Sequence, residues 1–485
     1  MVVNLRLVAR LLCPAVFWFG LCGLIPAGWA LVVKERLAAG CFIGAALCAV
    51  ALSVLLHRVG RQARLNVTLR DLFVFTVSLW VLCILLAAIP LWLILDDLNF
   101  AGAIFESASA LSCTGATAIA HLDGREQSVL LWRSMLQFFG GIGFVVAGAA
   151  LLPSFLLGGL NLFKTESSSF DGQAKLTAHI KTMAIGLLLW YAATAILCTL
   201  CYMIAGLDWF LALNAALCTV ATGGMMPLDA SMNGLPAAVH YWAMLFMILG
   251  SLPFFVILSS ISGNYLQVWR DEQVRGLFKI IVLTAFFVIA SLIFINDYDF
   301  ERALRVGLFN IISIISTTGF ALEDFSAWNP FATYIFFIIL AIGGCSGSTS
   351  GGIKVFRLQI CYAMFKTQLT KALHPHQIIE PHYNGQLVSS ALIRAVITYF
   401  VGYILLAILS SGVGVLLGLS LPDAITASIS ALSNVGPAMG TSLGPEANFS
   451  EVGTALHLLF SFDMLAGRLE IIPVLLCLSP RIWRL

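Results

Sequence analysis

The chain has few charged residues for its length. Of 485 residues, 26 are Lys or Arg and 24 are Asp or Glu, so that charged residues make up 10% of the sequence and hydrophobic residues 60%. An ordinary soluble domain has roughly 25% charged residues. This composition excludes a cytosolic enzyme, a disordered chain, a coiled coil and a secreted disulfide scaffold. We therefore expect an all-α polytopic membrane protein.

Sequence patterns that carry enzyme chemistry are also missing. The chain has no HExxH zinc-protease pattern, no GxSxG nucleophile elbow and no P-loop. Paired CxxC motifs with the spacing of a zinc site are absent too. The net charge of +2 gives no reason to expect nucleic acid as a partner. The sequence therefore predicts a protein that is not an enzyme and holds no organic cofactor.

Ten apolar stretches are long enough to cross a bilayer as helices, which takes about 20 residues. They cover roughly residues 8–32, 38–57, 72–95, 128–157, 182–206, 236–262, 277–296, 330–362, 386–418 and 450–478. An even number of crossings puts both termini on one side. With the N-terminus inside, 18 Lys and Arg lie in cytoplasmic segments, six lie outside and two lie within spans. The positive-inside rule then predicts a multi-pass protein with both termini in the cytoplasm.

Four further apolar stretches, near residues 99–112, 208–221, 300–316 and 421–434, are too short to cross. Each begins near Asp or Asn, which suits a helix N-terminus, and each ends in small and hydroxyl residues that include glycine. This pattern is typical of re-entrant helices. In the predicted orientation all four enter the membrane from outside.

From residue 72 onward the chain repeats one unit: long helix, short helix, glycine-bearing turn, long helix. The turns cover residues 112–116, 221–224, 316–320 and 433–437, and they align on Gly115, Gly223, Gly319 and Gly436. Near-regular spacing indicates internal repetition rather than isolated helix breaks, which is the plainer alternative. We expect a two-helix segment at 1–70 and pore repeats at 71–165, 166–270, 271–375 and 376–485.

Four such turns around one axis predict a ring of backbone carbonyls. Irregular backbone at membrane depth is tolerated only inside protein or beside a watery cavity. A carbonyl ring can replace the hydration shell of a cation, and glycine gives the backbone freedom to aim carbonyls inward. The short helices would present their negative C-terminal ends to the ion.

Two features suggest a gate. The glycine-rich tract 343–352 carries five Gly, four Ser or Thr and one Cys within the predicted span 330–362, and such a sequence cannot remain a good helix. A mobile plug beneath the filter explains it better than a simple packing bend. Arg468 lies deep in the last span, where a charge by default marks a functional site. An ion pair with Asp463 or Glu470 is the alternative role for Arg468.

The sequence resembles the Trk/Ktr/HKT superfamily of potassium transporters, most closely the bacterial Trk pore subunits, over essentially the whole chain. The motifs that carry the resemblance are Phe105-Glu106-Ser107, the run Gln137-Phe138-Phe139-Gly140-Gly141-Ile142-Gly143, the tract from Gly343 to Val355, and Gly467-Arg468-Leu469-Glu470. Members with serine at the first filter glycine tend toward Na⁺, so that Gly115 favours K⁺. The fourth turn departs from the pattern, because Asn434-Val435 replaces Thr-type residues.

The resemblance implies a K⁺-selective uptake channel or transporter, with K⁺ as the transported ion. Its expected filter residues are Cys113, Thr114, Gly115, Ala221, Thr222, Gly223, Thr317, Thr318, Gly319, Asn434, Val435 and Gly436. Its expected gate residues are Gly343, Gly344, Cys345, Ser346, Gly347, Ser348, Thr349, Ser350, Gly351, Gly352 and Arg468. It also implies a homodimer of pore subunits surrounded by membrane lipid, and a cytosolic nucleotide-binding ring as regulator.

The sequence does not decide whether transport is passive or coupled to a second ion. A secondary transporter that couples K⁺, or another solute, to H⁺ or Na⁺ remains the alternative. An inverted twofold repeat with helix N-termini at the site would favour a carrier of organic or anionic substrates, whereas this repeat is fourfold and parallel.

Overall fold

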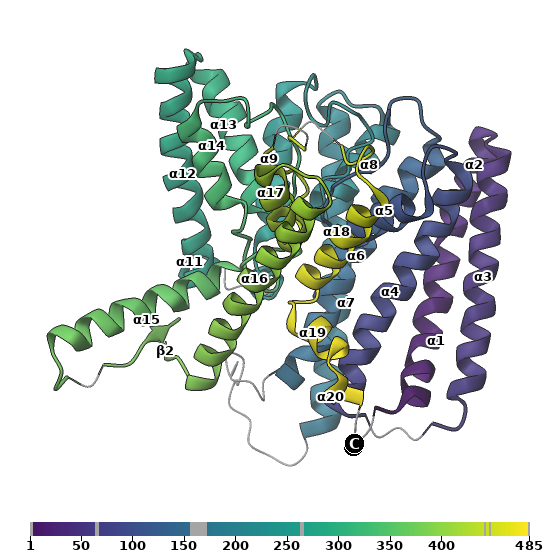
Figure 1. Ribbon diagram of the computed structural model, residues 1–485, viewed down its shortest axis with the longest axis horizontal. Coiled ribbons are helices and arrows are strands. Elements are labelled where there is room, and N and C mark those ends of the chain that lie inside the picture. Colours follow the sequence, from purple (N-terminus) through teal and green to yellow (C-terminus); the bar gives the residue numbers. More distant parts are fainter. Residues whose placement is uncertain are drawn as a thin grey trace.

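The computed structural model describes residues 3–63, 67–155, 172–261, 266–377, 379–440, 443–445 and 448–483. Nearly all of its regular structure is helical, and most of the helices run across one thick bundle (Figure 1). This confirms the predicted all-α polytopic architecture. A two-stranded hairpin, β1 (His382–Tyr383) with β2 (Gln386–Leu387), is the sheet in the described part of the chain.

The N-terminal segment is a hairpin of helices at one edge of the bundle (Figure 1). It comprises α1 (Leu5–Cys22), α2 (Leu24–Val33) and α3 (Arg36–Gly60). Close packing depends on small residues, because a β-carbon on Gly20 would overlap the side chain of Ala49. Beyond this hairpin, the Glu35 carboxylate accepts the backbone N–H of Gln127 at 2.8 Å, which ties the hairpin to the first repeat.

Six helical stretches are long and apolar enough to cross a membrane in the described chain. They are α1 with α2, α3, α4 (Leu69–Ile94), residues 184–204 of α7 (Gly172–Ile204), α12 (Glu272–Asn296) and α16 (Ser390–Leu416). The other four predicted spans are α6 (Gln127–Phe155) and three interrupted helices. The count of ten crossings stays a prediction.

The three interruptions differ in cause. The first follows α9 (Ala237–Ser251), where Pro253 separates it from α10 (Phe254–Ile261) and the short α11 (Leu266–Arg270). The second is the glycine-rich tract between α14 (Pro330–Ile339) and α15 (Val355–Leu373). The third separates α18 (Thr454–Arg468) from α19 (Ile472–Leu478) and α20 (Pro480–Trp483). There Glu470 and Ile471 both have positive φ, so the predicted continuous last span is wrong.

All four predicted re-entrant helices are present. They are α5 (Phe100–Leu111), α8 (Trp209–Val220), α13 (Phe300–Ile315) and α17 (Leu421–Ser433). Asn99, Asp208 and Asp299 cap the first three with their side chains. The fourth is capped by Ser420, and the buried Asp423 lies three residues into the helix. We call these four the pore helices.

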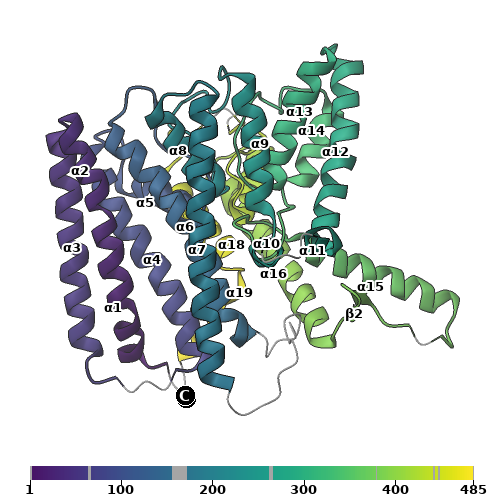
Figure 2. The same cartoon turned by 180° about the vertical axis from the view of Figure 1, so that it is seen from behind.

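Helix α15 leaves the bundle. Together with the β-hairpin it extends beyond the body on one side in both views (Figures 1 and 2). Tyr362, Phe365, Leu369 and Leu373 are each more than half exposed along this helix. An apolar stripe of this kind suits a lipid surface or a second copy of the chain.

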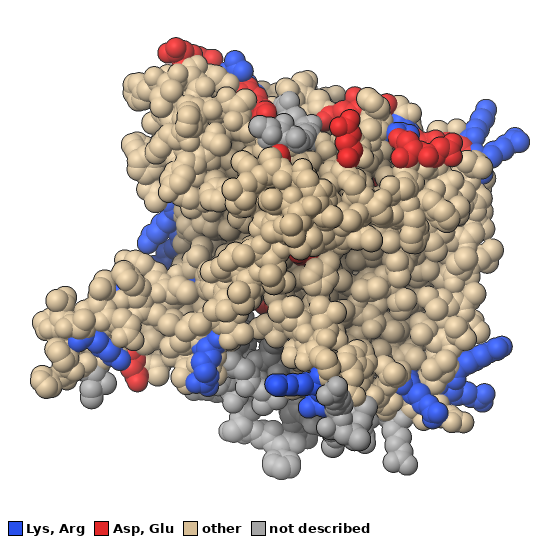
Figure 3. Space-filling view, viewed as in Figure 1, with Lys and Arg blue, Asp and Glu red and all other residues tan. Residues whose placement is uncertain are grey.

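Charge is unequal at the two ends of the bundle (Figure 3). Acidic side chains gather at the end where the pore helices begin, and several are paired there, as in Arg302–Glu323 at 2.8 Å and Arg305–Glu301 at 2.7 Å. Basic side chains gather at the opposite end, near the last turn of α3 and α20. We call these the acidic end and the basic end.

A buried ion pair joins the first pore helix to the helix that follows it. The Arg133 Nε donates to Glu106 Oε1 at 2.6 Å, and both side chains are at most 2% exposed. Glu106 also accepts the backbone N–H of Ala118 at 2.8 Å, which agrees with the structural role that its place in a pore helix suggests. Arg133 is one of the six basic residues that the charge count places outside, and in the structure it lies buried within α6.

We expect Glu106→Gln to destabilise the protein strongly. Removing one partner of a buried ion pair leaves the other charge uncompensated, which costs about 3–5 kcal/mol. Thermal unfolding in detergent should show a large fall in Tm for Glu106→Gln and a smaller one for Glu106→Gln with Arg133→Met, since the double variant removes both charges. Glu301→Gln, which breaks an exposed pair, is the control. Equal effects of Glu106→Gln and the control would contradict this account.

Candidate ion filter and gate

Every pore helix ends in the same backbone turn. Cys113, Thr222, Thr317 and Asn434 adopt left-handed conformations, with φ of 56°, 49°, 56° and 54°. In each turn the next N–H donates to the carbonyl five residues back, as in Thr114 to Ser109 at 2.9 Å and Thr318 to Ser313 at 2.8 Å. These are the bonds of a Schellman motif. The fourfold repeat inferred from the sequence therefore recurs in backbone geometry.

A glycine with positive φ stands two residues after each left-handed residue. These glycines are Gly115, Gly224, Gly319 and Gly436. A β-carbon on any of them would overlap a carbonyl oxygen of the next turn: Gly223 for Gly115, Thr318 for Gly224, Val435 for Gly319, and Thr114 for Gly436. The last contact returns to the first turn, so the four turns form a closed ring with no room for side chains at these glycines.

This ring corrects the sequence alignment of the second turn. Aligned by sequence, the second turn has Gly223 at the glycine position, with Ala221 and Thr222 before it. The structure puts Gly224 there, because Gly224 has the positive φ and the overlap with the neighbouring carbonyl, whereas Gly223 has neither feature. The residues equivalent to Cys113-Thr114-Gly115 are therefore Thr222-Gly223-Gly224, and Ala221 belongs to the helix end.

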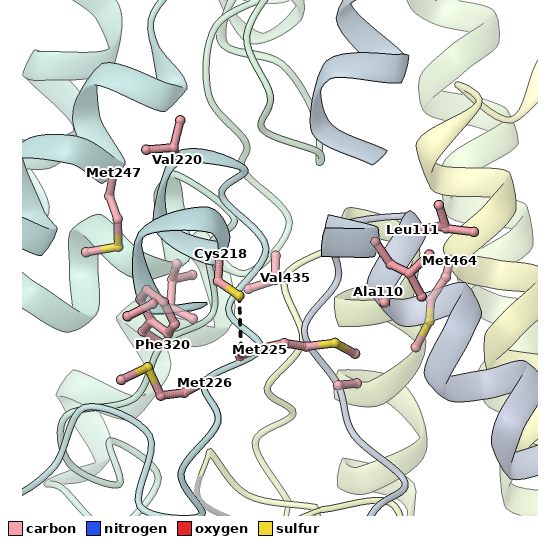
Figure 4. Packing of buried hydrophobic residues seen from close by; sticks show 14 of the residues in the cluster. Ala110, Leu111, Cys218, Val220, Met225, Met226, Met247, Phe320, Val435 and Met464 are labelled. Carbon is pink, nitrogen blue, oxygen red and sulfur yellow. Dashed lines mark hydrogen bonds between the residues drawn. The ribbon is translucent and has the colours of Figure 1, made fainter. Parts of the chain in front are cut away.

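The segment after each turn confirms this register. The N–H five residues beyond the left-handed residue donates to its own pore helix in three repeats: Ala118 to Glu106, Leu322 to Asn310 and Met439 to Thr426. In the second repeat that position is Pro227, which has no N–H to satisfy. Figure 4 shows a related bond, in which the Cys218 thiol donates to the carbonyl of Met225 at 3.0 Å among buried apolar side chains.

The glycine-rich tract lies buried against these turns. Residues 348–352 are fully or almost fully buried, and the backbone of the tract bonds to its surroundings at several points. Cys345 N–H donates to the Ser251 carbonyl at 3.0 Å, and Phe254 N–H donates to the Gly347 carbonyl at 3.0 Å. The tract is therefore an ordered segment packed into the break between α9 and α10.

The tract contacts three of the four left-handed residues directly. The Thr222 hydroxyl donates to the Thr349 hydroxyl at 3.0 Å, and the Gly351 N–H donates to the Thr317 hydroxyl at 2.7 Å. A β-carbon on Gly351 would lie 2.8 Å from the side chain of Asn434. The tract therefore lies against the ring at the C-termini of three pore helices.

Arg468 completes this layer on the side of the first turn. It is 2% exposed, and its guanidinium donates to the carbonyls of Thr349 at 2.8 Å and Gly140 at 3.1 Å, with the Cys113 sulfur 3.5 Å away. The two acidic residues considered as partners are engaged elsewhere: Glu470 pairs with Arg357 and Asp463 accepts from Ser410. The positive charge thus lies beneath the ring.

Two further cations lie near the tract, as their positions directly after it in the sequence indicate. Lys354 caps the start of α15, and its ammonium donates to the Ser350 carbonyl. The Arg357 guanidinium lies 3.8 Å from the centre of the Tyr399 ring and pairs with Glu470 just after α18. In the sequence they are the first two basic residues after the glycine-rich tract. With Arg468 they line a small pocket at the basic side of the tract.

Comparison with known proteins agrees with this geometry. The family model named TrkH, described as a cation transport protein, matches residues 39–485. The chain is 35% identical over 426 residues to the Trk system potassium uptake protein TrkI of Halomonas elongata, covering 87% of this chain and 86% of TrkI. It is 31% identical over 494 residues to TrkH of the same organism, covering 99% and 100%.

A solved structure matches the whole fold. The crystal structure of the potassium transporter TrkH from Vibrio parahaemolyticus superposes with a TM-score of 0.90 at 26% identity, covering 99% of this chain and all of that one. Family model, relatives and fold thus agree over nearly the full length. The chain belongs to the TrkH family of cation transport proteins, and it is a membrane transporter and not an enzyme.

Proposed function

We propose that this protein conducts K⁺ selectively across the bacterial inner membrane, as the pore subunit of a potassium uptake system. The observation that carries the proposal is the closed ring of four glycine-bearing turns at the C-termini of four converging helices. Carbonyls in such a ring can replace the hydration shell of a cation, and helix C-termini carry partial negative charge. The named relatives are potassium uptake proteins, which supports K⁺ as the ion.

In this proposal the filter comprises Cys113-Thr114-Gly115, Thr222-Gly223-Gly224, Thr317-Thr318-Gly319 and Asn434-Val435-Gly436, in repeats bounded near 71–165, 166–270, 271–375 and 376–485. The glycine-rich tract and Arg468 form the gate, because they lie against the inner end of the ring. Ions enter from the acidic end, where negative side chains attract cations, and the basic end faces the cytoplasm with both termini.

The proposal includes two kinds of partner. The exposed apolar stripe of α15 supports a homodimer of pore subunits within membrane lipid. A cytosolic nucleotide-binding ring would dock at the basic end and act on α15, which begins three residues after the tract ends. Whether flux is passive or coupled to H⁺ or Na⁺ is tested by tracer flux in proteoliposomes across defined K⁺ and pH gradients. Uptake driven by a pH gradient alone would favour coupling.

We expect Gly115→Ser to lower K⁺ flux and raise the relative permeability to Na⁺. Gly115 has a φ of 91°, and a side chain there would push away the Gly223 carbonyl. The K⁺/Na⁺ permeability ratio in proteoliposomes measures this. Gly124→Ser is a matched control, because Gly124 has a φ of 88° and open space around it. A wild-type ratio in Gly115→Ser would remove Gly115 from the filter.

Arg468→Ala should increase K⁺ flux per folded protein. A guanidinium about 6 Å from K⁺ repels it by about 3 kcal/mol at an effective dielectric of 20. The substitution also removes the donor to the Thr349 carbonyl, and so it loosens the tract. Arg468→Lys keeps the charge and should stay nearer the wild-type flux. Loss of folded yield with no gain in flux would show that Arg468 is a structural residue instead.

Deleting residues 347–350 should raise basal flux and weaken regulation by a cytosolic partner, because a shortened tract cannot reach across the ring. Thr349→Val is a milder test, since it removes the hydroxyl that bonds to Thr222 and to the Gly250 carbonyl. Thr284→Val serves as its control, because the Thr284 hydroxyl bonds only within its own helix. A folded deletion variant with wild-type flux, with and without the partner, would rule out the plug.

A further inference from the structure

One side chain from outside the four turns reaches into the ring. Gln137 lies on α6, is fully buried, and uses both ends of its amide on the second turn. Its Nε2 donates to the carbonyl oxygen of Gly223, and its Oε1 accepts the backbone N–H of Met225 at 3.1 Å. The Gly223 carbonyl is one of the four that close the ring. This contact therefore acts on the proposed filter itself.

The same position in two other repeats is apolar. Gly140, Gly250 and Gly467 each face a carbonyl at the end of a pore helix, at Leu111, Val220 and Leu432. They therefore occupy equivalent places on the helices that follow the turns. Three residues before them stand Gln137, Met247 and Met464. A thioether has no N–H to donate, so neither methionine can make the bond that Gln137 makes.

The second turn is also unusual at the residue that accepts this bond. Its equivalents in the other turns are Thr114, Thr318 and Val435, which all carry side chains, whereas the second turn has Gly223. A β-carbon on Gly223 would lie 2.6 Å from Oε1 and 2.7 Å from Nε2 of Gln137. The backbone of Gly223 has no positive φ that would require glycine. Space for the Gln137 amide is thus the physical reason for glycine here.

We propose that Gln137 is a specificity-determining residue of the filter, acting on the second quadrant through the Gly223 carbonyl. The proposal rests on the K⁺-filter function proposed above. When an amide N–H donates to a carbonyl oxygen, it occupies part of the lone-pair density of that oxygen and fixes the direction of the carbonyl. That carbonyl then presents a weaker field to a cation than its three counterparts. A weaker field favours K⁺ over the smaller and more strongly hydrated Na⁺.

Gln137→Met tests the donor, because it installs the residue found at the equivalent positions. The K⁺/Na⁺ permeability ratio in proteoliposomes, measured on the full chain and normalised to folded protein, should fall about fivefold, as expected for a net hydrogen-bond energy of about 1 kcal/mol. Met247→Leu, an apolar change at the equivalent position, is the control and should keep the wild-type ratio. A folded Gln137→Met variant with the wild-type ratio would overturn the proposal.

Gly223→Ala tests the fit independently, so that the proposal can be judged even where Gln137→Met fails to fold. Alone, Gly223→Ala should cut K⁺ flux at least about tenfold, since its β-carbon meets the Gln137 amide. In the Gln137→Ala background the same change should cost little further flux, because the amide is gone. Additive losses in the double variant would overturn the proposal.

These measurements also separate this inference from the function on which it rests. Absent or unselective K⁺ flux in the wild-type protein and in Met247→Leu would contradict the K⁺ filter as a whole. Selective flux in both, together with an unchanged ratio in Gln137→Met and additive losses at Gly223, would leave the filter standing and remove Gln137 from it.

Discussion

Four helix C-termini meet inside this protein, and the surrounding structure has to compensate their negative partial charges. Each end carries a partial negative charge, and these charges repel one another in a low-dielectric setting. Each end also has carbonyls without helical partners, which need hydrogen-bond donors from elsewhere. The Schellman bonds satisfy part of them within each turn. The guanidinium of Arg468 supplies positive charge from below, at the carbonyls of Gly140 and Thr349. The negative potential of the four helix ends, which Arg468 partly balances, would also stabilise a dehydrated cation.

The fourfold symmetry is strict in the backbone and loose in the side chains. All four turns share the left-handed residue and the glycine two positions on, because the ring closes only through those conformations. The groups that hold the turns differ: Glu106, Asn310 and Thr426 each satisfy the same N–H, and Pro227 removes the need for a partner. The four turns thus share their backbone geometry, whereas the side chain that accepts the remaining backbone N–H differs from one turn to the next.

Much of this architecture could be predicted from sequence, and the failures have identifiable causes. The pore helices followed from length and from capping residues such as Asn99 and Asp208, and the helix break at 343–352 followed from glycine content. The register of the second turn did not, because Gly223 and Gly224 are adjacent and only φ and a neighbouring carbonyl tell them apart.

Other misses were long-range. Glu106 and Arg133 pair across a turn, and nothing local in the sequence joins them. The break after Arg468 falls at Glu470 and Ile471, where no glycine or proline occupies the two positions of positive φ. The pattern of apolar residues predicts a continuous helix there, and the signal for the interruption was Pro473, which lies in the first turn of α19. Such local violations of propensity are expected near functional sites.

Two strained residues of the four turns are also bonded to the glycine-rich tract. Thr222 and Thr317 are β-branched and left-handed, a combination that stores about 1–3 kcal/mol each. Their hydroxyls are the groups that bond to Thr349 and Gly351 of the tract. In the gate proposed above, moving the tract aside would break these two bonds, which contribute about 1 kcal/mol net each, and would expose two polar hydroxyls beside the ring. The proposed gate is thus bonded to the turns of the proposed filter themselves, so that its movement would change the polarity beside the ring.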